Sequence, residues 1–418
     1  MSLNILKPRQ IAVDILSAVL EKKQNLDDVF ESMTDKLDTR DKAFIRMLVT
    51  TALRRLGQID KALKELLRNP LPPKAKNVQN ILRLAICQIV WMDIPPHAVV
   101  STAVDLVKTS KQSFYAKLTN GLLRNFLRQK EDLIKEEEAG KINTPSWLFD
   151  AWTKDYGLEK ATQIANANLT QASIFVSVKS DVKEWSQRLS GQINDTGSIE
   201  LPENVYIPQL DGFKEGKWWV QDAAASIPVK LFDDLKDKYV ADFCSAPGGK
   251  TAALIASGAK VDAFDISEKR LKRVEENLKR LQLKANLIAK DANEIAGENI
   301  YDAILIDAPC SATGTIRRHP DLYFHRTPED IKNLTNAQLN LLKTAHRLVK
   351  AKGQVIYCTC SLQKEEGENI ISQVQNLFDV ISISDSRFDM YLTPEGFIRT
   401  FPDQNKDGFF IAKLQKKD

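Results

Sequence analysis

Apolar residues recur at helical spacing along the first third of the chain. In residues 11–19 and again in 81–89 they fall on one face of a helix, three or four positions apart. Prolines, which lack the amide proton that a helix interior requires, separate such stretches at positions 70, 72, 73, 95 and 96. Asn120-Gly121 would suit a hairpin turn, but the apolar residues around it keep helical spacing. The pattern predicts an all-α domain over residues 1–140.

A smaller module is predicted to follow the helices. A charged run from Glu136 to Gly140, with Pro145 just beyond it, is typical of a domain boundary. Residues 141–220 mix a helical stretch with short strand-like runs such as 174–178, which predicts a small α+β linker subdomain. This region holds most of the tryptophans, at positions 147, 152, 185, 218 and 219. Core packing is the favoured role for these side chains, and stacking on RNA bases is the alternative.

The pattern changes after Gln221, where short apolar runs alternate with amphipathic helices. The predicted strands are 239–243, 261–264, 285–289, 303–306 and 354–357. Such alternation is typical of a parallel sheet covered by helices, so residues 221–418 are predicted to form an α/β, Rossmann-like domain. The basic helix 269–280 also contains Glu275 and Glu276, four positions before Lys279 and Arg280, which favours a solvated, self-paired surface over an RNA-binding patch.

Composition supports a folded protein of several domains. The 418 residues are 43% hydrophobic and 27% charged, which excludes collagen-like, coiled-coil and disordered chains. No apolar run is long enough to span a membrane, and the start of the chain lacks a signal-peptide core, so a cytoplasmic protein is expected. Five cysteines are too few for a disulfide framework and are expected to be free thiols.

The charge is unevenly distributed between the predicted domains. Residues 1–140 contain 23 basic and 17 acidic side chains, a net charge of +6, whereas the remainder of the chain has a net charge of −2. A basic module beside a nearly neutral one fits a nucleic-acid-binding domain joined to a catalytic domain. An ordinary solvated helical surface would give the same balance.

A loop rich in small residues follows the first predicted strand of the α/β domain. It runs from Asp242 to Thr251 and contains Pro247-Gly248-Gly249-Lys250. A phosphate-binding P-loop would need glycine where this chain has Cys244, and the glycine spacing of a dinucleotide fold is absent. The loop therefore favours an adenosine-type ligand without a required pyrophosphate.

Acidic residues end the next three predicted strands: Asp265, Asp291 and Asp307. The carboxyl ends of parallel strands line the crevice in which such sheets bind ligands, and an acid after the second strand can accept the hydroxyl groups of a ribose. Each residue alone could be a helix cap. Together with the small-residue loop they make S-adenosylmethionine the best candidate ligand.

Two cysteine motifs lie at the ends of adjacent predicted strands. Asp307-Ala308-Pro309-Cys310 follows the fourth strand, and Thr359-Cys360-Ser361 follows the fifth, so the two thiols are expected to meet. Buried structural cysteines are one alternative. A zinc site is another, but the spacing of Cys244, Cys310, Cys358 and Cys360 does not match the usual zinc modules, and no metal is expected.

These motifs resemble those of the RNA cytosine-5 methyltransferases of the NOL1/NOP2/Sun family, in its bacterial RsmB/Sun branch. The resemblance rests on the sequences PGGKT, DAPCSATG and TCS, and on the run TGTIRRHPD from Thr313 to Asp321. The helical domain resembles the NusB fold, most clearly in residues 95–99 and 120–123. Ser245 departs from the family, in which alanine is frequent.

The resemblance implies an activity, a cofactor and a set of site residues. It implies methylation of C5 of a cytidine in small-subunit (16S) ribosomal RNA, with Cys360 as the nucleophile, Cys310 assisting product release and Asp307 contacting the cytosine. It also implies that S-adenosylmethionine is held by Cys244, Ser245, Ala246, Pro247, Gly248, Gly249, Lys250, Asp265, Asp291 and Asp307. The RNA-binding role falls to the NusB-like domain, and a monomer without membrane contact is expected.

Several alternatives stay open at this point. Cys310 would be the nucleophile if the chain followed the DNA cytosine methyltransferases, which use a Pro-Cys thiol. An amino methyltransferase is disfavoured because such enzymes need no cysteine at positions 310 and 360. The remaining alternatives are methylation of another RNA and a non-catalytic ribosome-assembly or antitermination factor.

Overall fold

The computed structural model describes residues 3–417, which form two compact units. The first unit comprises the chain up to Gln171 together with Ile316–Arg326, and the second comprises Ala172–Thr315 and the chain from Thr327 onward. The division into three domains at residues 140 and 220 stays a prediction. Among residues 3–417, no helix is long and apolar enough to cross a membrane.

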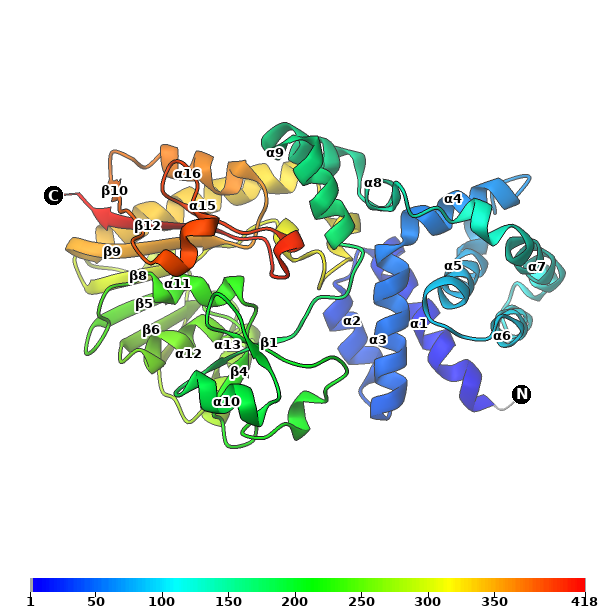
Figure 1. The fold of residues 1–418 in the computed structure, drawn as a ribbon, viewed down its shortest axis with the longest axis horizontal. Helices are drawn as coiled ribbons and strands as arrows, with labels where there is room; N and C mark the ends of the chain where they lie inside the picture. The colour runs from blue at the N-terminus through cyan, green and yellow to red at the C-terminus, as the bar shows by residue number, and fades with distance from the viewer. Residues whose placement is uncertain (1–2, 418) are drawn as a thin grey trace. The chain divides into compact units, whose positions relative to one another are not determined.

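The first unit is helical, as predicted, and is drawn in blue to cyan and blue-green in Figure 1. Its helices are α1 (Leu3–Lys22), α2 (Leu26–Thr34), α3 (Thr39–Arg54), α4 (Leu56–Leu66), α5 (Lys76–Trp91), α6 (Pro96–Thr109), α7 (Ala116–Leu133), α8 (Ala139–Asn143) and α9 (Ser146–Ala167). The predicted proline breaks fall between α4 and α5 and at the start of α6. Asn120-Gly121 lies inside α7, so the prediction of a helix there is confirmed.

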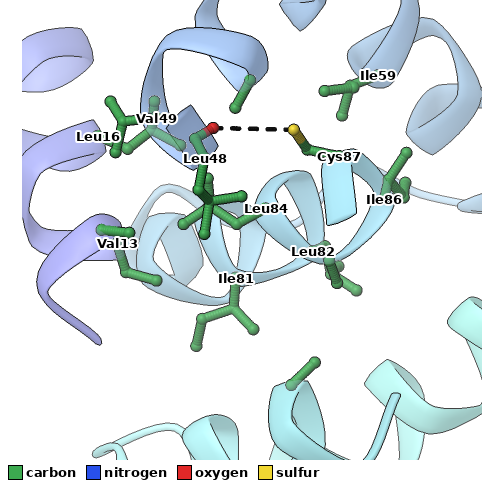
Figure 2. Packing of buried hydrophobic residues seen from close by; sticks show 14 of the residues in the cluster. Val13, Leu16, Leu48, Val49, Ile59, Ile81, Leu82, Leu84, Ile86 and Cys87 are labelled. Carbon is green, nitrogen blue, oxygen red and sulfur yellow. Dashed lines mark hydrogen bonds between the residues drawn. The ribbon is translucent and has the colours of Figure 1, made fainter. Parts of the chain in front are cut away.

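The core of the helical unit is a continuous apolar cluster from α1 to α7. Figure 2 shows part of it, where α5 contributes Ile81, Leu84 and Cys87 between neighbouring helices. The Cys87 thiol donates a hydrogen bond of 3.8 Å to the carbonyl of Leu48, so even its weak polar group has a partner. Burying a leucine or isoleucine side chain, such as Leu84 or Ile81, stabilises the fold by about 1.5–3 kcal/mol.

A distant segment of the chain, Ile316–Arg326, completes the helical unit. The Arg54 guanidinium, which is buried, donates two hydrogen bonds to the carbonyl of Arg317, at 2.7 and 3.2 Å. The buried Asp321 carboxylate accepts the backbone amide of Leu26 at the first turn of α2. The short helix α14 (Leu322–His325) also belongs to this segment. The sequence pattern assigned these residues to the α/β domain, because nothing in it signals such long-range pairing.

The second unit contains the predicted α/β sheet. Its strand order is β10-β12-β9-β8-β5-β6-β7, and β11 pairs with β12. The bounds are β5 (Tyr239–Phe243), β6 (Lys260–Asp265), β7 (Asn286–Ala289), β8 (Tyr301–Asp307), β9 (Val349–Thr359), β10 (Phe378–Val380), β11 (Ile398–Arg399) and β12 (Phe410–Lys416). Strands β5 to β9 pair in parallel, as predicted, whereas β10, β11 and β12 pair antiparallel and were not predicted.

Helices connect the strands and place the ends of the parallel strands at one edge. They are α11 (Ile227–Lys230), α12 (Gly249–Ala256), α13 (Glu268–Arg280), α15 (Pro328–Leu348) and α16 (Glu368–Ser372). Helix α15 begins with a capping box, in which Thr327 and Asp330 satisfy each other's backbone amides. The carboxyl ends of β5, β6, β8 and β9 therefore lie together, where ligands bind in open parallel sheets.

A small antiparallel sheet precedes this domain in sequence. Its order is β2-β3-β1-β4, with β1 (Phe175–Val178), β2 (Gln192–Ile193), β3 (Ile199–Glu200) and β4 (Trp218–Val220), and helix α10 spans Val182–Arg188. Trp185 and Trp218 are 3% and 0% exposed and lie in its core. The packing interpretation of these two tryptophans is therefore confirmed.

Candidate functional site

The two motif cysteines meet at the carboxyl ends of β8 and β9. The Sγ atoms of Cys310 and Cys360 are 3.4 Å apart, and both residues are half-buried. The strands pair in parallel with Asp307 opposite Cys358, so each thiol follows its strand into the same crevice. The fifth thiol, Cys87, lies in the core of the helical unit. The site thus contains two adjacent thiols, open to one side, at the position where open sheets bind ligands.

Backbone hydrogen bonds join the two cysteine-bearing loops. The amide of Gly314 donates to the carbonyl of Cys360 at 3.0 Å, and the amide of Ala308 donates to that of Cys358 at 3.0 Å. The amide of Leu362 donates to the hydroxyl group of Thr313 at 3.0 Å. These bonds hold the thiols at contact distance without a covalent bond between them.

A carboxylate that sequence reasoning missed connects the same loops. Glu366 is fully buried and accepts hydrogen bonds from the Ser311 amide at 2.8 Å, the Ser311 hydroxyl at 2.5 Å and the Ser361 hydroxyl at 2.5 Å. Gln338 of α15 donates to it at 3.2 Å. Burial raises the pKa of Glu366, and the hydrogen bonds from the serines lower it in part. In the sequence this residue sits in the polar run Lys364-Glu365-Glu366, which resembles an exposed surface segment.

The environment raises the pKa of three thiols near the site. The hydrogen bond with Cys360, and then burial, raise the pKa of Cys310 well above its usual value. Cys310 therefore keeps its proton at neutral pH and can donate it. Burial also raises the pKa of Cys358, with a further contribution from Asp307. Burial raises the pKa of Cys244 to about 12, so this thiol is protonated as well.

Asp307 is paired with Lys250 between the cysteines and the loop after β5. The Lys250 Nζ atom lies 2.7 Å from Asp307 Oδ2, and the Cys358 thiol lies 3.5 Å from Oδ1. Burial lowers the pKa of Lys250, but the attraction of Asp307 outweighs it, so the net pKa is raised and the lysine is charged. Phe409 lies under the ammonium group at 5.3 Å. The pair fixes a carboxylate beside the thiols at the mouth of the crevice.

The loop between β5 and α12 lies at the same edge of the sheet. Gly248 adopts a φ of +99°, and a Cβ there would lie 3.0 Å from Val274, so this position requires glycine. Cys244 also adopts a left-handed conformation, with a φ of 62°. The amide of Ala246 donates to Asp265 at 3.4 Å, which ties the loop to the end of β6. Ser245, Pro247 and Gly249 complete the loop.

The two other predicted acids have different surroundings. The Asp265 carboxylate, whose side chain is fully buried, accepts the Ser267 amide at 2.9 Å and pairs with Arg270 at 2.7 Å. Asp291 caps a short 3₁₀ helix by accepting the Asn293 amide at 2.9 Å. Asp265 thus lies against the loop after β5, whereas the contacts of Asp291 are those of a helix cap.

Buried polar atoms without partners mark the start of the same loop. Among the residues that the structure describes, Asp242 Oδ1 and Ser245 Oγ are buried and make no hydrogen bond within the protein. Asp242 Oδ2 accepts the hydroxyl group of Thr251 at 2.6 Å. Because buried polar atoms are rarely left unsatisfied, these two atoms suit a ligand or water at this position.

Family models match both the α/β domain and the helical domain of the chain. The model of the 16S rRNA methyltransferase RsmB/F family matches residues 230–415, and that of the NusB family matches residues 6–128. The predicted fold, a NusB-like helical domain followed by a Rossmann-like methyltransferase domain, is thereby confirmed.

Individual relatives match nearly the whole chain. Ribosomal RNA small subunit methyltransferase B of Escherichia fergusonii is 33% identical over 430 residues, covering 98% of each chain. The crystal structure of PH0851 is 25% identical, with a TM-score of 0.79, and covers 98% of this chain and 99% of its own. A methyltransferase homolog from Pyrococcus horikoshii is 28% identical, with a TM-score of 0.55, over 65% of this chain and 100% of its own. This chain belongs to the RsmB/F family of 16S rRNA methyltransferases.

Proposed function

We propose that this protein transfers a methyl group from S-adenosylmethionine to C5 of a cytidine in 16S ribosomal RNA, through a covalent bond between Cys360 and C6 of the base. The observation that carries the proposal is the 3.4 Å separation of the Cys310 and Cys360 sulfur atoms at the crevice. One thiol can form the bond to the base while the other carries a proton. An amino methyltransferase needs neither group.

The chemistry requires a nucleophile because C5 of cytosine is itself a poor one. The Cys360 thiolate adds to C6, and the electron pair of the C5–C6 double bond moves to C5. C5 then takes the methyl group, as the bond between the methyl carbon and its sulfonium sulfur breaks. Loss of the C5 proton to a base restores the double bond, and the bond between Cys360 and C6 breaks. The base must leave its stack to reach the thiol.

Asp307 assists the first step of this reaction, the attack on C6, and Cys310 assists the last step, the release of the product. Cys310 keeps its proton because its pKa is raised by the hydrogen bond with Cys360 and by burial. It can therefore protonate the Cys360 sulfur as product leaves. Asp307 is held by Lys250 beside the thiols and would contact the cytosine edge, favouring protonation of N3 as C6 is attacked.

The residues around the loop after β5 fit S-adenosylmethionine, which supplies an electrophilic methyl group when bound. Residues 244–250 would hold it together with Asp265 and Asp291. The unsatisfied atoms Asp242 Oδ1 and Ser245 Oγ can receive a polar ligand, and Gly248, which the positive φ and the closeness of Val274 require to be glycine, fixes the shape of the loop. Asp265, adjacent to the loop through Ala246, would accept the ribose hydroxyl groups.

Product analysis tests the proposal. The purified protein is incubated with 16S RNA transcribed in vitro and methyl-labelled S-adenosylmethionine, and the digested nucleosides are separated. Label in 5-methylcytidine is expected with the wild-type protein and with Cys87→Ala, a control thiol in the helical core, and none with Cys360→Ala. Label in N4-methylcytidine, or undiminished labelling by Cys360→Ala, would contradict it.

A further inference from the structure

Helix α7 presents a cationic ridge on its exposed side. Lys117, Gly121, Arg124 and Arg128 are spaced by four, three and four residues, so they lie on one helical face, and all four are exposed. We call these four residues the α7 ridge. Figure 1 shows α7 in the helical unit beside α6.

Basic residues outnumber acidic residues around the α7 ridge. Residues 106–130 contain six lysines and arginines and no aspartate or glutamate. Among residues 3–417, no carboxylate forms an ion pair with the cations of the α7 ridge. The acids of α7 itself, Glu131 and Asp132, lie at its end, three and four residues after Arg128, and Asp105 of α6 lines a hollow together with Arg124. The ridge therefore carries a net positive charge without ion pairs to the described residues and is complementary to a polyanion.

Gly121 is not explained by packing within the protein. A Cβ built at Gly121 would meet nothing within 4 Å, whereas one at Gly57 would lie 2.2 Å from the carbonyl oxygen of Ile142. Glycine inside a helix costs about 1 kcal/mol relative to alanine. An exposed glycine between cations, inside an 18-residue helix, thus lowers helix stability without an internal benefit. Close approach of an external backbone would account for it.

A groove of about 610 Å³ runs beside the α7 ridge. Its lining joins the segment after α4 to α7 and includes Arg68, Asn69, Lys117 and Asn125, with no acidic side chain. At the start of α7, Phe114 is 69% exposed, and its ring centroid lies 4.5 Å from that of Tyr115. Tyr115 lines the groove, so the exposed ring of Phe114 lies next to a groove residue and suits stacking by an unpaired base.

We propose that the α7 ridge docks the sugar–phosphate backbone of a single-stranded segment of the substrate RNA, with a base stacked on Phe114. The inference rests on the proposed RNA substrate and adds where that RNA is held. Lys117, Arg124 and Arg128 neutralise phosphates, and Gly121 lets the backbone lie directly on the helix. The mixed aromatic and cationic surface favours RNA over an acidic protein partner.

Gly121→Ala distinguishes an effect on RNA binding from an effect on folding. We expect it to lower RNA affinity but to raise or preserve the stability of the protein. Alanine should raise or preserve the melting temperature of the protein, since it favours the helix. It should weaken binding of 16S RNA transcribed in vitro by about three- to tenfold, because its methyl group holds the backbone away. KM for RNA should rise while kcat at saturating RNA is unchanged. Wild-type affinity in Gly121→Ala would overturn the role of this glycine.

Charge variants test the remainder of the α7 ridge. The triple variant Lys117→Gln, Arg124→Gln, Arg128→Gln should lower the slope of log affinity against log salt by about 2, since each lost phosphate contact on a single strand contributes about 0.7. The control Lys36→Gln, Arg40→Gln, Lys154→Gln removes three exposed cations from other parts of the helical unit and should keep the wild-type slope. Equal slopes of log affinity against log salt in the two triple variants would overturn the proposal. That result is expected if the α7 ridge binds a protein and not RNA.

The binding assays do not depend on turnover, so the two proposals can fail separately. If Cys360→Ala retained methylation while the α7 ridge variants lost RNA affinity, the covalent mechanism would be wrong and the docking surface would stand. If the ridge variants bound RNA normally and Cys360→Ala was inactive, only the docking surface would be wrong.

Discussion

Glu366 holds Ser311 with two hydrogen bonds, one from the backbone amide to Oε1 at 2.8 Å and one from the hydroxyl group to Oε2 at 2.5 Å. Ser311 directly follows Cys310, whereas Glu366 lies six residues beyond Cys360. The position of one thiol is therefore fixed by a side chain from the segment that carries the other. This arrangement makes the relative position of the thiols sensitive to a residue that does not touch either sulfur.

Replacing Glu366 with alanine should reduce both stability and turnover. The change leaves the buried Ser311 amide and two hydroxyl groups without their acceptor, which costs about 2–4 kcal/mol in the free energy of unfolding. Denaturant titration measures this loss, and kcat should fall more than KM changes. The exposed neighbour Glu365→Ala is the control and should leave both unchanged. Glu366→Gln should recover part of each loss, and an alanine variant with normal stability and kcat would contradict this role.

The two cysteine variants should have opposite effects on a covalent protein–RNA adduct. Cys360→Ala should form none, because it lacks the proposed nucleophile. Cys310→Ala should accumulate a denaturant-resistant adduct in the presence of S-adenosylmethionine, because release of the product is slowed. Denaturing gel electrophoresis with labelled RNA measures both. The reverse pattern would make Cys310 the nucleophile.

Asp265→Ala should weaken S-adenosylmethionine binding and leave RNA affinity nearly unchanged. Loss of a charged hydrogen-bond acceptor for the ribose should lower affinity about tenfold or more. Isothermal titration calorimetry of the protein with S-adenosylmethionine measures the change. Asp302→Ala is a matched control, because Asp302 lies near the amino end of β8 and pairs with Lys350. Equal cofactor affinity in a folded Asp265→Ala protein would remove this residue from the site.

Asp242 should make stability depend on pH. Burial raises the pKa of this fully buried carboxyl to about 7, the Thr251 hydrogen bond lowers it in part, and the charge of Asp307 raises it further. Between pH 4 and 7 the unfolded chain has lost this proton while the native protein retains it. Stability should therefore fall as pH rises through this window, by at most about 1.4 kcal/mol per pH unit, and level off above it.

The variant Asp242→Asn tests this pH dependence because it cannot titrate at that position. The difference in unfolding free energy between wild type and Asp242→Asn should shift in favour of the variant as pH rises from 4 to 7. Urea titrations at several pH values measure this difference. A difference that is constant with pH would show that Asp242 is ionised in the native protein.

Local pattern was sufficient to predict the helical first domain and the parallel strands. Helical spacing and proline placement predicted an all-α first domain, with helical stretches that lie in α1, α5 and α7. The apolar runs predicted β5 to β8 to within two residues at each end, and the central part of β9. Strands β10, β11 and β12 were not predicted, and they pair antiparallel with one another and with β9 on one side of the sheet. Local pattern contains no information about which distant strand is the partner.

The candidate site was predictable where a motif sits at the end of a strand. Adjacent parallel strands must bring Cys310 and Cys360 together, and the loop after β5 must lie beside them. Glu366 was not predictable, because burial of a glutamate depends on four donors that only the folded chain brings together. The ion pair of Lys250 with Asp307 likewise depends on the order of β5 and β8 in the sheet.

The inclusion of Ile316–Arg326 in the helical unit has a consequence for synthesis on the ribosome. Residues up to Gln171 emerge first, yet Arg54 and the amide of Leu26 obtain their partners only when Arg317 and Asp321 follow. At about 5–20 residues per second, translation of the intervening chain takes on the order of 10–30 seconds. During that time the Arg54 guanidinium of the nascent helical unit lacks the Arg317 carbonyl to which it donates in the folded protein. Its last step of folding is thus timed by translation of the catalytic domain.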